Sequence, residues 1–188
     1  LDRKIGLAGL LRNWFFVYSG NLVGSILLAF IIAKSSGLLS SNVGATAINI
    51  AAGKTSAEAI GGLSHNYAFF FRGIGCNWLV CLAVMMAIAS QDIVGKVWGI
   101  FFPIMAFVAS GFEHCVANMY FIPAGIFAKG FPGACEASGK SAEALAALNW
   151  GSMFTQNMVS VTLGNFVGGA LFVGGVYWWL FVRAAQKS

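Results

Sequence analysis

The chain has 188 residues, of which 59% are hydrophobic and 9% are charged, and its mean hydropathy is +0.80. Soluble domains of this length are far less apolar, so the composition indicates an integral membrane protein. The net charge of +5 is scattered through loops and ends rather than gathered with aromatic residues, which argues against a nucleic-acid-binding surface. The four cysteines do not suggest a disulfide scaffold, and no Cys/His spacing resembles a metal site.

The first expected membrane span covers residues 14–33, an uncharged stretch between Arg12 and Lys34. It contains Gly20-Asn21-Leu22-Val23-Gly24, in which small residues four apart permit close contact between helices. Helix packing is therefore the favoured role of this motif. Residues 34–66 follow as a polar connection rich in Gly, Ser and Ala, with a short surface helix expected around residues 56–60.

The second expected span covers residues 67–90, with Arg72 near its entrance. Asn77 places an amide inside this otherwise apolar helix. The amide either lines a pore or ties two helices together, and the residues alone leave both interpretations open.

The third expected span, residues 97–128, is too long for one straight crossing, because about 20 helical residues cross a bilayer core. Ser110 and Gly111 predict a break near residues 110–114, since Gly tolerates unusual backbone angles and Ser can satisfy freed backbone groups. Discontinuous helices with polar groups at the break are typical of transport sites. The second half-helix would begin at this break, and its N-terminal N–H groups would suit a small anion.

Glu113 and His114 are the two ionisable residues of this span and lie near its midplane. We expect His114 to donate a proton or a strong hydrogen bond to a passing anion, because its charge changes easily near neutral pH. The competing interpretation is a neutral histidine that only fixes the loop. For Glu113 we expect a structural role, since a carboxylate aimed into an anion path would repel the substrate.

The last expected span covers residues 157–181 and contains Gly164-Asn165-Phe166-Val167-Gly168, which repeats the motif of the first span. With four crossings, the two copies lie on helices of opposite direction, as an inverted-topology repeat predicts. In such a repeat, two further spans, one of them broken, would precede the first Gly-Asn helix. We therefore expect about two spans upstream of this chain.

The string Ala109-Ser110-Gly111-Phe112-Glu113-His114-Cys115-Val116-Ala117-Asn118-Met119 resembles the formate/nitrite transporter family. The segment Cys76-Asn77-Trp78-Leu79-Val80-Cys81-Leu82-Ala83 and both Gly-Asn motifs add to the resemblance, which covers nearly the whole chain. It implies an all-α, aquaporin-like inverted-repeat bundle with a broken central helix, assembled as a homo-pentamer with one pore per protomer. Residues 1–188 would then form a single channel domain that holds the C-terminal four of six spans.

The same resemblance assigns the substrate pathway to five residues: His114, Asn118, Phe107, Asn77 and Val80. His114 takes the role of the central pore histidine, and Phe107 that of an apolar constriction. Glu113, with Ser110 and Gly111, supports the pore loop. Similar proteins often carry a vestibule lysine where this chain has Gly61, and either Lys54 or His65 is a candidate substitute.

These observations predict a channel or proton-coupled transporter, not an enzyme, for small monovalent weak-acid anions. Formate is the first candidate, and nitrite and hydrosulfide are the alternatives. The expected partners are these anions, protons, the lipid bilayer and further copies of the chain, without a cofactor, in a bacterial inner membrane. An intramembrane serine protease is the alternative from another class, but Ser110 and His114 are four apart on one segment, without a separate base. A haem-binding subunit would need paired intramembrane histidines.

Overall fold

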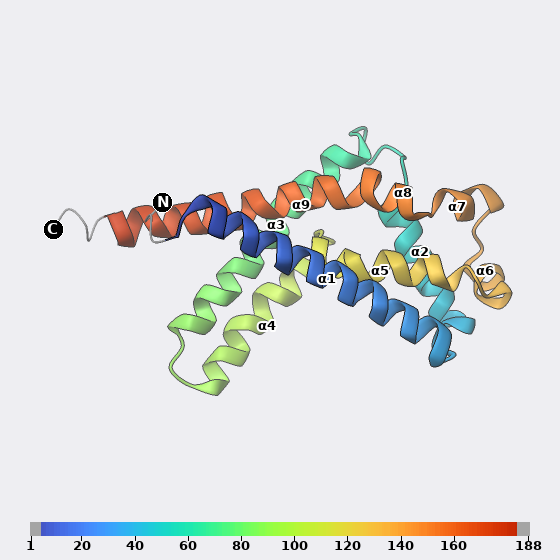
Figure 1. Ribbon diagram of the computed structural model, residues 1–188, viewed down its shortest axis with the longest axis horizontal. Helices are drawn as coiled ribbons and strands as arrows, with labels where there is room; N and C mark the ends of the chain where they lie inside the picture. Colours follow the sequence, from blue (N-terminus) through green and yellow to red (C-terminus); the bar gives the residue numbers. More distant parts are fainter. Residues whose placement is uncertain (1–4, 184–188) are drawn as a thin grey trace. The chain divides into compact units, whose positions relative to one another are not determined.

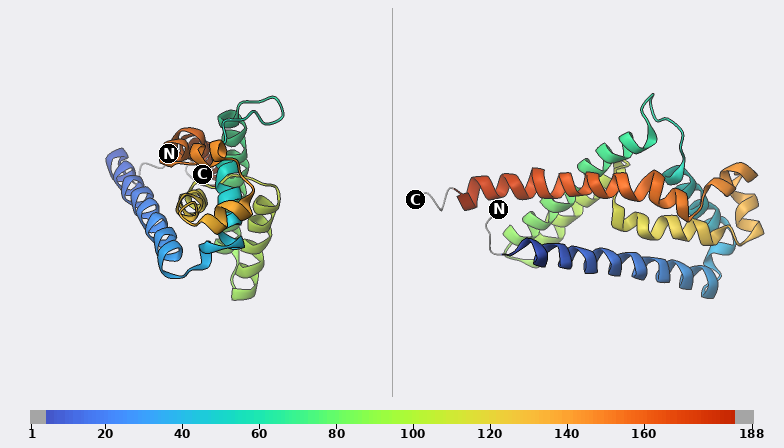
Figure 2. Two further views of the ribbon diagram at one scale, coloured as in Figure 1. Left: turned by 90° about the vertical axis from the view of Figure 1, so that its right-hand side faces the viewer. Right: turned by 45° about the horizontal axis from the view of Figure 1, so that its top comes forward.

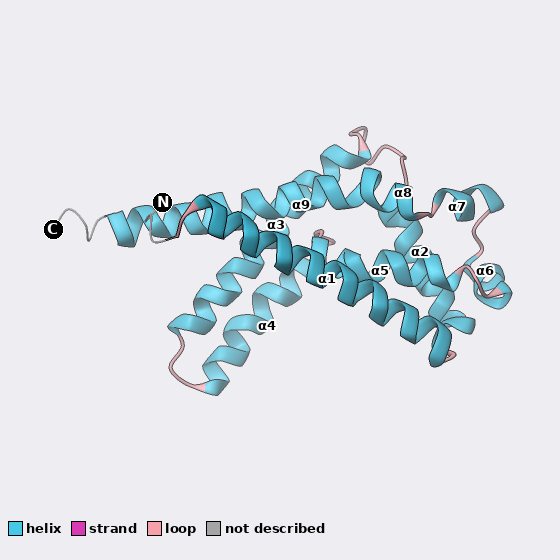
Figure 3. Cartoon of the chain, viewed as in Figure 1, coloured by secondary structure: helices cyan, strands magenta, loops and turns pink. Residues whose placement is uncertain are grey.

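The computed structural model describes residues 5–183, and almost all of them are helical (Figures 1 and 3). Within that range no β-strand forms, apart from one isolated bridge between Ile60 and Leu63. Three helices are long and apolar enough to cross a membrane: Leu7–Ser35, His65–Ala89 and Trp150–Arg183. Two shorter apolar helices, Ile93–Ala109 and Cys115–Ala128, divide the region of the third expected span. The all-helical membrane architecture expected from the composition is therefore present.

The chain divides into two compact units, each assembled from segments distant in sequence. The first unit contains Asn66–His114 together with the C-terminal helix from Ser160 onward. The second unit contains Leu7–His65 and Cys115–Val159.

In the first unit, α3 (His65–Ala89) packs against α9 (Val159–Phe166) and against the π-helical stretch η3 (Val167–Gly175) that continues it. The two backbones touch, because a Cβ built on Gly164 would lie 2.1 Å from the Phe70 carbonyl oxygen, and one on Gly168 would lie 2.2 Å from that of Ile74. Only glycine fits at such distances. The helix α4 (Ile93–Ala109) follows α3 and begins at Asp92, whose carboxylate accepts a hydrogen bond from the Gly95 N–H at 2.8 Å. The last π-helical stretch is η4 (Trp178–Arg183).

In the second unit, α1 (Leu7–Ser35) and α2 (Asn42–Thr55) pack against α5 (Cys115–Ala128), and two views in Figure 2 show α2 beside α5. A Cβ built on Gly125 of α5 would lie 2.3 Å from the Ala51 Cβ of α2, so these helices are also in close contact. Short elements complete the unit: η1 (Leu38–Ser40), α6 (Pro132–Ser138), α7 (Ala142–Ala147), α8 (Trp150–Ser152) and the π-helical η2 (Met153–Met158).

The helix α2 replaces the polar connection expected over residues 34–66. The short helix expected around residues 56–60 is wrong, because those residues are not helical. The small residues of α2 lower its hydropathy below that of a membrane span, yet its residues Ile48 and Ala51 are completely buried. A packed helix made of small residues therefore looks, by composition, like a loop.

Candidate functional site

The loop between α4 and α5 comprises residues 110–114. Gly111 has a φ of 64°, in the left-handed region that glycine adopts without strain. Its N–H donates to the Val108 carbonyl at 3.1 Å, and the Phe112 N–H donates to the Phe107 carbonyl at 3.0 Å. These two bonds form a Schellman motif, which ends a helix with its last carbonyls satisfied. The apolar stretch is therefore interrupted by main-chain bonds around Gly111.

Ser110 takes part in this break through its backbone, whose N–H donates to the Ala106 carbonyl at 3.0 Å. Its side chain is exposed, and within residues 5–183 the hydroxyl makes no hydrogen bond. The expectation that the serine side chain satisfies freed backbone groups therefore does not describe this helix end. The helix ends at Ser110 and Gly111, but the backbone hydrogen bonds around Gly111 satisfy the freed carbonyls without the serine side chain.

Phe112 and Glu113 attach the loop to the helices of the first unit. The Phe112 ring lies against Gly75 of α3, where a built Cβ would be 2.6 Å from the ring. The Glu113 N–H donates to the Arg72 carbonyl at 3.3 Å, and the Asn165 side-chain N–H₂ donates to the Glu113 carbonyl at 2.8 Å. Glu113 is only 4% exposed. Both of these hydrogen bonds use the main chain of Glu113.

Asn165 is the residue that joins the loop to two helices. Its Nδ2 also donates to the Gly73 carbonyl of α3 at 2.9 Å, and its own carbonyl accepts a hydrogen bond from Asn77 Nδ2 at 2.9 Å. In the sequence alone, Asn165 is recognisable only as part of a repeated packing motif. The available signal was an amide between two close-packing glycines, a position from which a side chain reaches a neighbouring backbone.

Asn77 therefore ties α3 to the last helix, one of the two interpretations open from the sequence. It is only partly buried, and its Oδ1 is shielded from solvent without a hydrogen-bond partner in the described part of the chain. A contribution to a permeation path stays a prediction. Val80, one turn farther along α3, is likewise partly buried.

His114 and Phe107 come together in the first unit. Their ring centroids are 6.0 Å apart and the ring planes meet at 61°, an edge-to-face arrangement. His114 is partly buried. The expected pore histidine and the expected apolar constriction thus lie in contact range across the loop that separates them in sequence.

Asn118 belongs to the second unit, where it is 1% exposed and joins a buried polar chain. Its Nδ2 donates to Asn157 Oδ1 at 2.8 Å, and Asn157 Nδ2 donates to the Lys54 carbonyl at 3.1 Å. His65 Nε2 lies 3.3 Å from the same carbonyl oxygen. Of the two candidate replacements for the vestibule lysine, Lys54 takes part in these hydrogen bonds through its backbone carbonyl and His65 through its ring.

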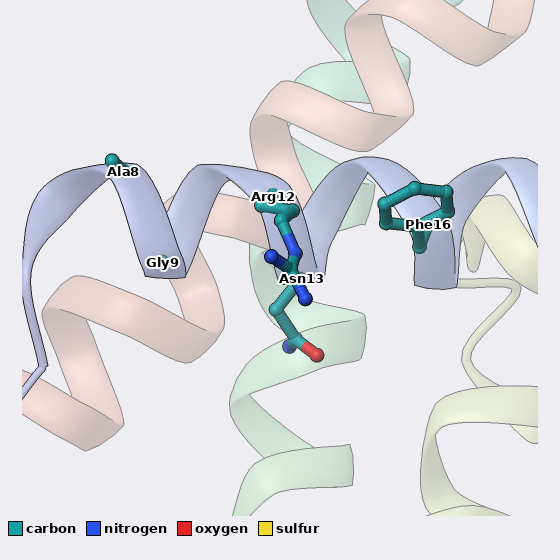
Figure 4. A pocket seen from close by; sticks show the side chains of 5 residues that line it. All are labelled: Ala8, Gly9, Arg12, Asn13 and Phe16. Atoms are coloured by element: carbon teal, nitrogen blue, oxygen red, sulfur yellow. The ribbon is translucent and has the colours of Figure 1, made fainter.

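Three hollows within residues 5–183 are lined by none of the five predicted pathway residues. The groove in Figure 4 runs along the start of α1 and is lined by Ala8, Gly9, Arg12, Asn13 and Phe16. A second, of about 610 Å³, lies between residues 52–58 and residues 140–148. Within residues 5–183, no cluster of three or more His, Cys, Asp or Glu side chains is placed to hold a metal ion.

The family model described as formate/nitrite transporter matches residues 1–179. The chain belongs to the formate/nitrite transporter family. The family resemblance seen in the sequence is thereby confirmed, and the family's description is that of a transporter rather than an enzyme.

Relatives within the formate/nitrite transporter family are similar along most of this chain. The probable formate transporter of Methanothermobacter thermautotrophicus is 44% identical over 97% of the chain and 64% of its own length. Formate channel FocA of Escherichia coli K12 is 35% identical over 96% of the chain and 62% of its own length. The chain thus spans slightly less than two thirds of these relatives.

Solved structures of the family share the fold. A pentameric formate channel with formate bound matches with a TM-score of 0.81 and 37% identity, over 96% of this chain and 69% of that one. An FNT family ion channel matches with a TM-score of 0.74 and 31% identity, over 93% of this chain and 61% of that one.

Proposed function

We propose that the protein conducts small monovalent weak-acid anions across a membrane, with formate as the first substrate. The observation that carries this proposal is the helix break at Gly111, which holds His114 against Phe107 in a chain whose relatives include formate channels. The intramembrane serine protease is disfavoured by a second observation. Within residues 5–183 the Ser110 hydroxyl makes no hydrogen bond to a base.

The proposed mechanism lowers the cost of moving a charge through an apolar passage. Apolar side chains at Phe107 and Val80 resist the bare anion, because a charge is poorly solvated beside them. His114 donates a proton or a strong hydrogen bond at this point, so the species that passes carries little charge. After passage the acid returns its proton to His114, or releases it to water while His114 takes up another proton from water. Amide groups at Asn118 and Asn77 supply hydrogen-bond donors along the path.

Hydrogen bonds to the main chain of Glu113 support the position of His114. Asn165 donates to the Glu113 carbonyl, and Glu113 donates its N–H to the Arg72 carbonyl, so the residue before His114 is anchored through both of its main-chain polar groups. We propose that this anchoring is the role of Glu113 in transport. Ser110 and Gly111 contribute the helix end.

We further propose that the protein works as a homo-pentamer with an aquaporin-like inverted repeat, in lipid, in a bacterial inner membrane. The pentameric formate channel supports the assembly, and the two Gly-Asn motifs support the repeat. Bacterial relatives such as the Escherichia coli channel support the location.

The test is uptake into liposomes by purified protein, measured in parallel for formate, nitrite and hydrosulfide across a pH series. We expect saturable formate uptake whose pH dependence is lost or displaced in His114→Asn. The matched control is His65→Asn, at the other of the chain's two histidines, which is expected to keep the shape of the pH profile. Equal profiles for wild type and His114→Asn with every anion would overturn the protonation role. Preference for nitrite or hydrosulfide would replace formate as the substrate.

A further inference from the structure

The buried chain Asn118, Asn157 and the Lys54 carbonyl has a direction that chemistry alone determines. A carbonyl oxygen can only accept hydrogen bonds, so Asn157 must turn its Nδ2 toward Lys54. Its Oδ1 then faces Asn118, which must supply its own Nδ2. The Lys54 carbonyl therefore sets the orientation of the Asn118 amide through two successive hydrogen bonds, with Asn157 between them.

The Lys54 carbonyl is a suitable anchor because it lies at the end of α2. The last four carbonyls of a helix have no partner within it and carry partial negative charge. Here the Asn157 amide at 3.1 Å and the His65 Nε2 at 3.3 Å both approach this oxygen. The contact also requires His65 to carry its hydrogen on Nε2.

Burial makes the opposite orientation costly. Asn157 is 0% exposed, Asn118 1% and His65 3%. Turning either amide over would place two oxygens against each other at a buried position, where a polar group without a partner is destabilising. An amide that is free to turn presents donor and acceptor edges alternately, whereas this one is held.

We propose that Asn157 is a positioning residue for permeation: it transmits the polarity of the α2 terminus to Asn118, so that Asn118 presents one fixed edge to the anion. This inference rests on the proposed function, in which Asn118 lines the pathway. Asn157 lies on η2, far in sequence from both of its partners, and no motif in the sequence marks it.

The decisive variant is Asn157→Asp, because a neutral carboxylic acid reproduces both bonds of the amide and a carboxylate does not. The acid O–H donates to the Lys54 carbonyl while its other oxygen accepts from Asn118; the ionised form has no donor and repels the carbonyl. Burial favours the neutral acid. Expressed as a ratio to wild type at each pH, formate uptake by Asn157→Asp is expected to fall at least about tenfold at high pH and to recover at low pH. Lys54 on α2 and His65 at the start of α3 are the ionisable residues that take part in these hydrogen bonds. His65→Ala is therefore measured alongside, to separate the titration of His65 from that of the new aspartic acid.

A constant ratio across the pH series, for Asn157→Asp assembled like wild type, overturns the proposal. If that variant does not assemble, Asn157→Ser decides: its short hydroxyl side chain reaches at most one partner, and uptake is expected to fall about tenfold without recovery at low pH. Wild-type uptake by Asn157→Ser would overturn the proposal. Failure of the proposed function is distinguishable, because wild-type protein itself would then transport none of the anions tested.

Discussion

The two copies of the Gly-Asn-x-Val-Gly motif have different surroundings. In the last helix, Gly164 and Gly168 touch the backbone of α3, and Asn165 donates to the carbonyls of Gly73 and Glu113. In α1, no described residue lies within 4 Å of a Cβ built on Gly20 or Gly24. There Asn21 donates to the Val17 carbonyl of its own helix at 2.9 Å.

The difference shows that the motif permits close contact between helices but does not by itself produce it. Small residues four apart allow a close approach only when another helix presents its backbone at that depth. Where α3 does so, the asparagine between the glycines reaches past the contact and fixes the loop that carries His114. The same five-residue pattern therefore supports the loop that carries His114 in one helix, and has no described residue within 4 Å of its built Cβ atoms in the other.

The largest expected effect comes from Gly164→Ala, compared with Gly24→Ala. The new methyl group at position 164 would meet the Phe70 carbonyl, and neither backbone can yield easily, so we expect a destabilisation of about 1–3 kcal/mol or more. Gly24→Ala should not destabilise the protein, because its methyl group meets nothing within 4 Å among the described residues and alanine is the better helix former by about 1 kcal/mol. Thermal unfolding of both variants in one detergent measures the contrast. Equal destabilisation would mean that the α1 motif also packs against a backbone.

An intermediate effect is expected from Asn165→Leu, compared with Asn21→Leu. The first variant removes the side-chain donor from the Gly73 and Glu113 carbonyls, each lost hydrogen bond costing about 0.5–1.5 kcal/mol, and frees the loop before His114. Formate uptake should fall at least tenfold, whereas Asn21→Leu breaks one exposed bond within α1 and should retain uptake. Liposome uptake at matched protein amounts is the measurement. Full uptake by Asn165→Leu would show that the loop holds its shape without this amide.

The smallest effect is expected from Asn77→Ala, which removes one donor from the Asn165 carbonyl and costs about 1 kcal/mol. Its value lies in separating the two interpretations of Asn77. If the amide only ties α3 to the last helix, uptake of formate, nitrite and hydrosulfide should fall by the same factor. A changed ratio among the three anions would instead place Asn77 on the permeation path.

The sequence was sufficient for features that depend on composition and on glycine geometry. Long apolar stretches predicted a helical membrane protein, and Ser110 with Gly111 indicated where an apolar stretch would be interrupted. The helix α2 was missed because its alanines and glycines give no hydropathy signal, and its burial depends on close contact with α5.

Long-range hydrogen bonds were the part of the candidate site that the sequence could not supply. Asn165 and Asn157 each bond to backbone carbonyls about 50 to 100 positions away, and a carbonyl has no residue type to recognise. Lys54 was predicted as a possible positive charge, yet the Asn157 and His65 side chains contact its peptide oxygen. Roles played by the main chain are invisible in a string of side chains.

At the helix end near Gly111, the backbone conformation does not depend on the side chain of the neighbouring Ser110. Because the Schellman bonds involve only peptide groups, the exposed Ser110 side chain can be exchanged without reopening the turn. New polar or bulky groups can therefore be introduced at position 110, four residues before His114, while the turn keeps its main-chain hydrogen bonds.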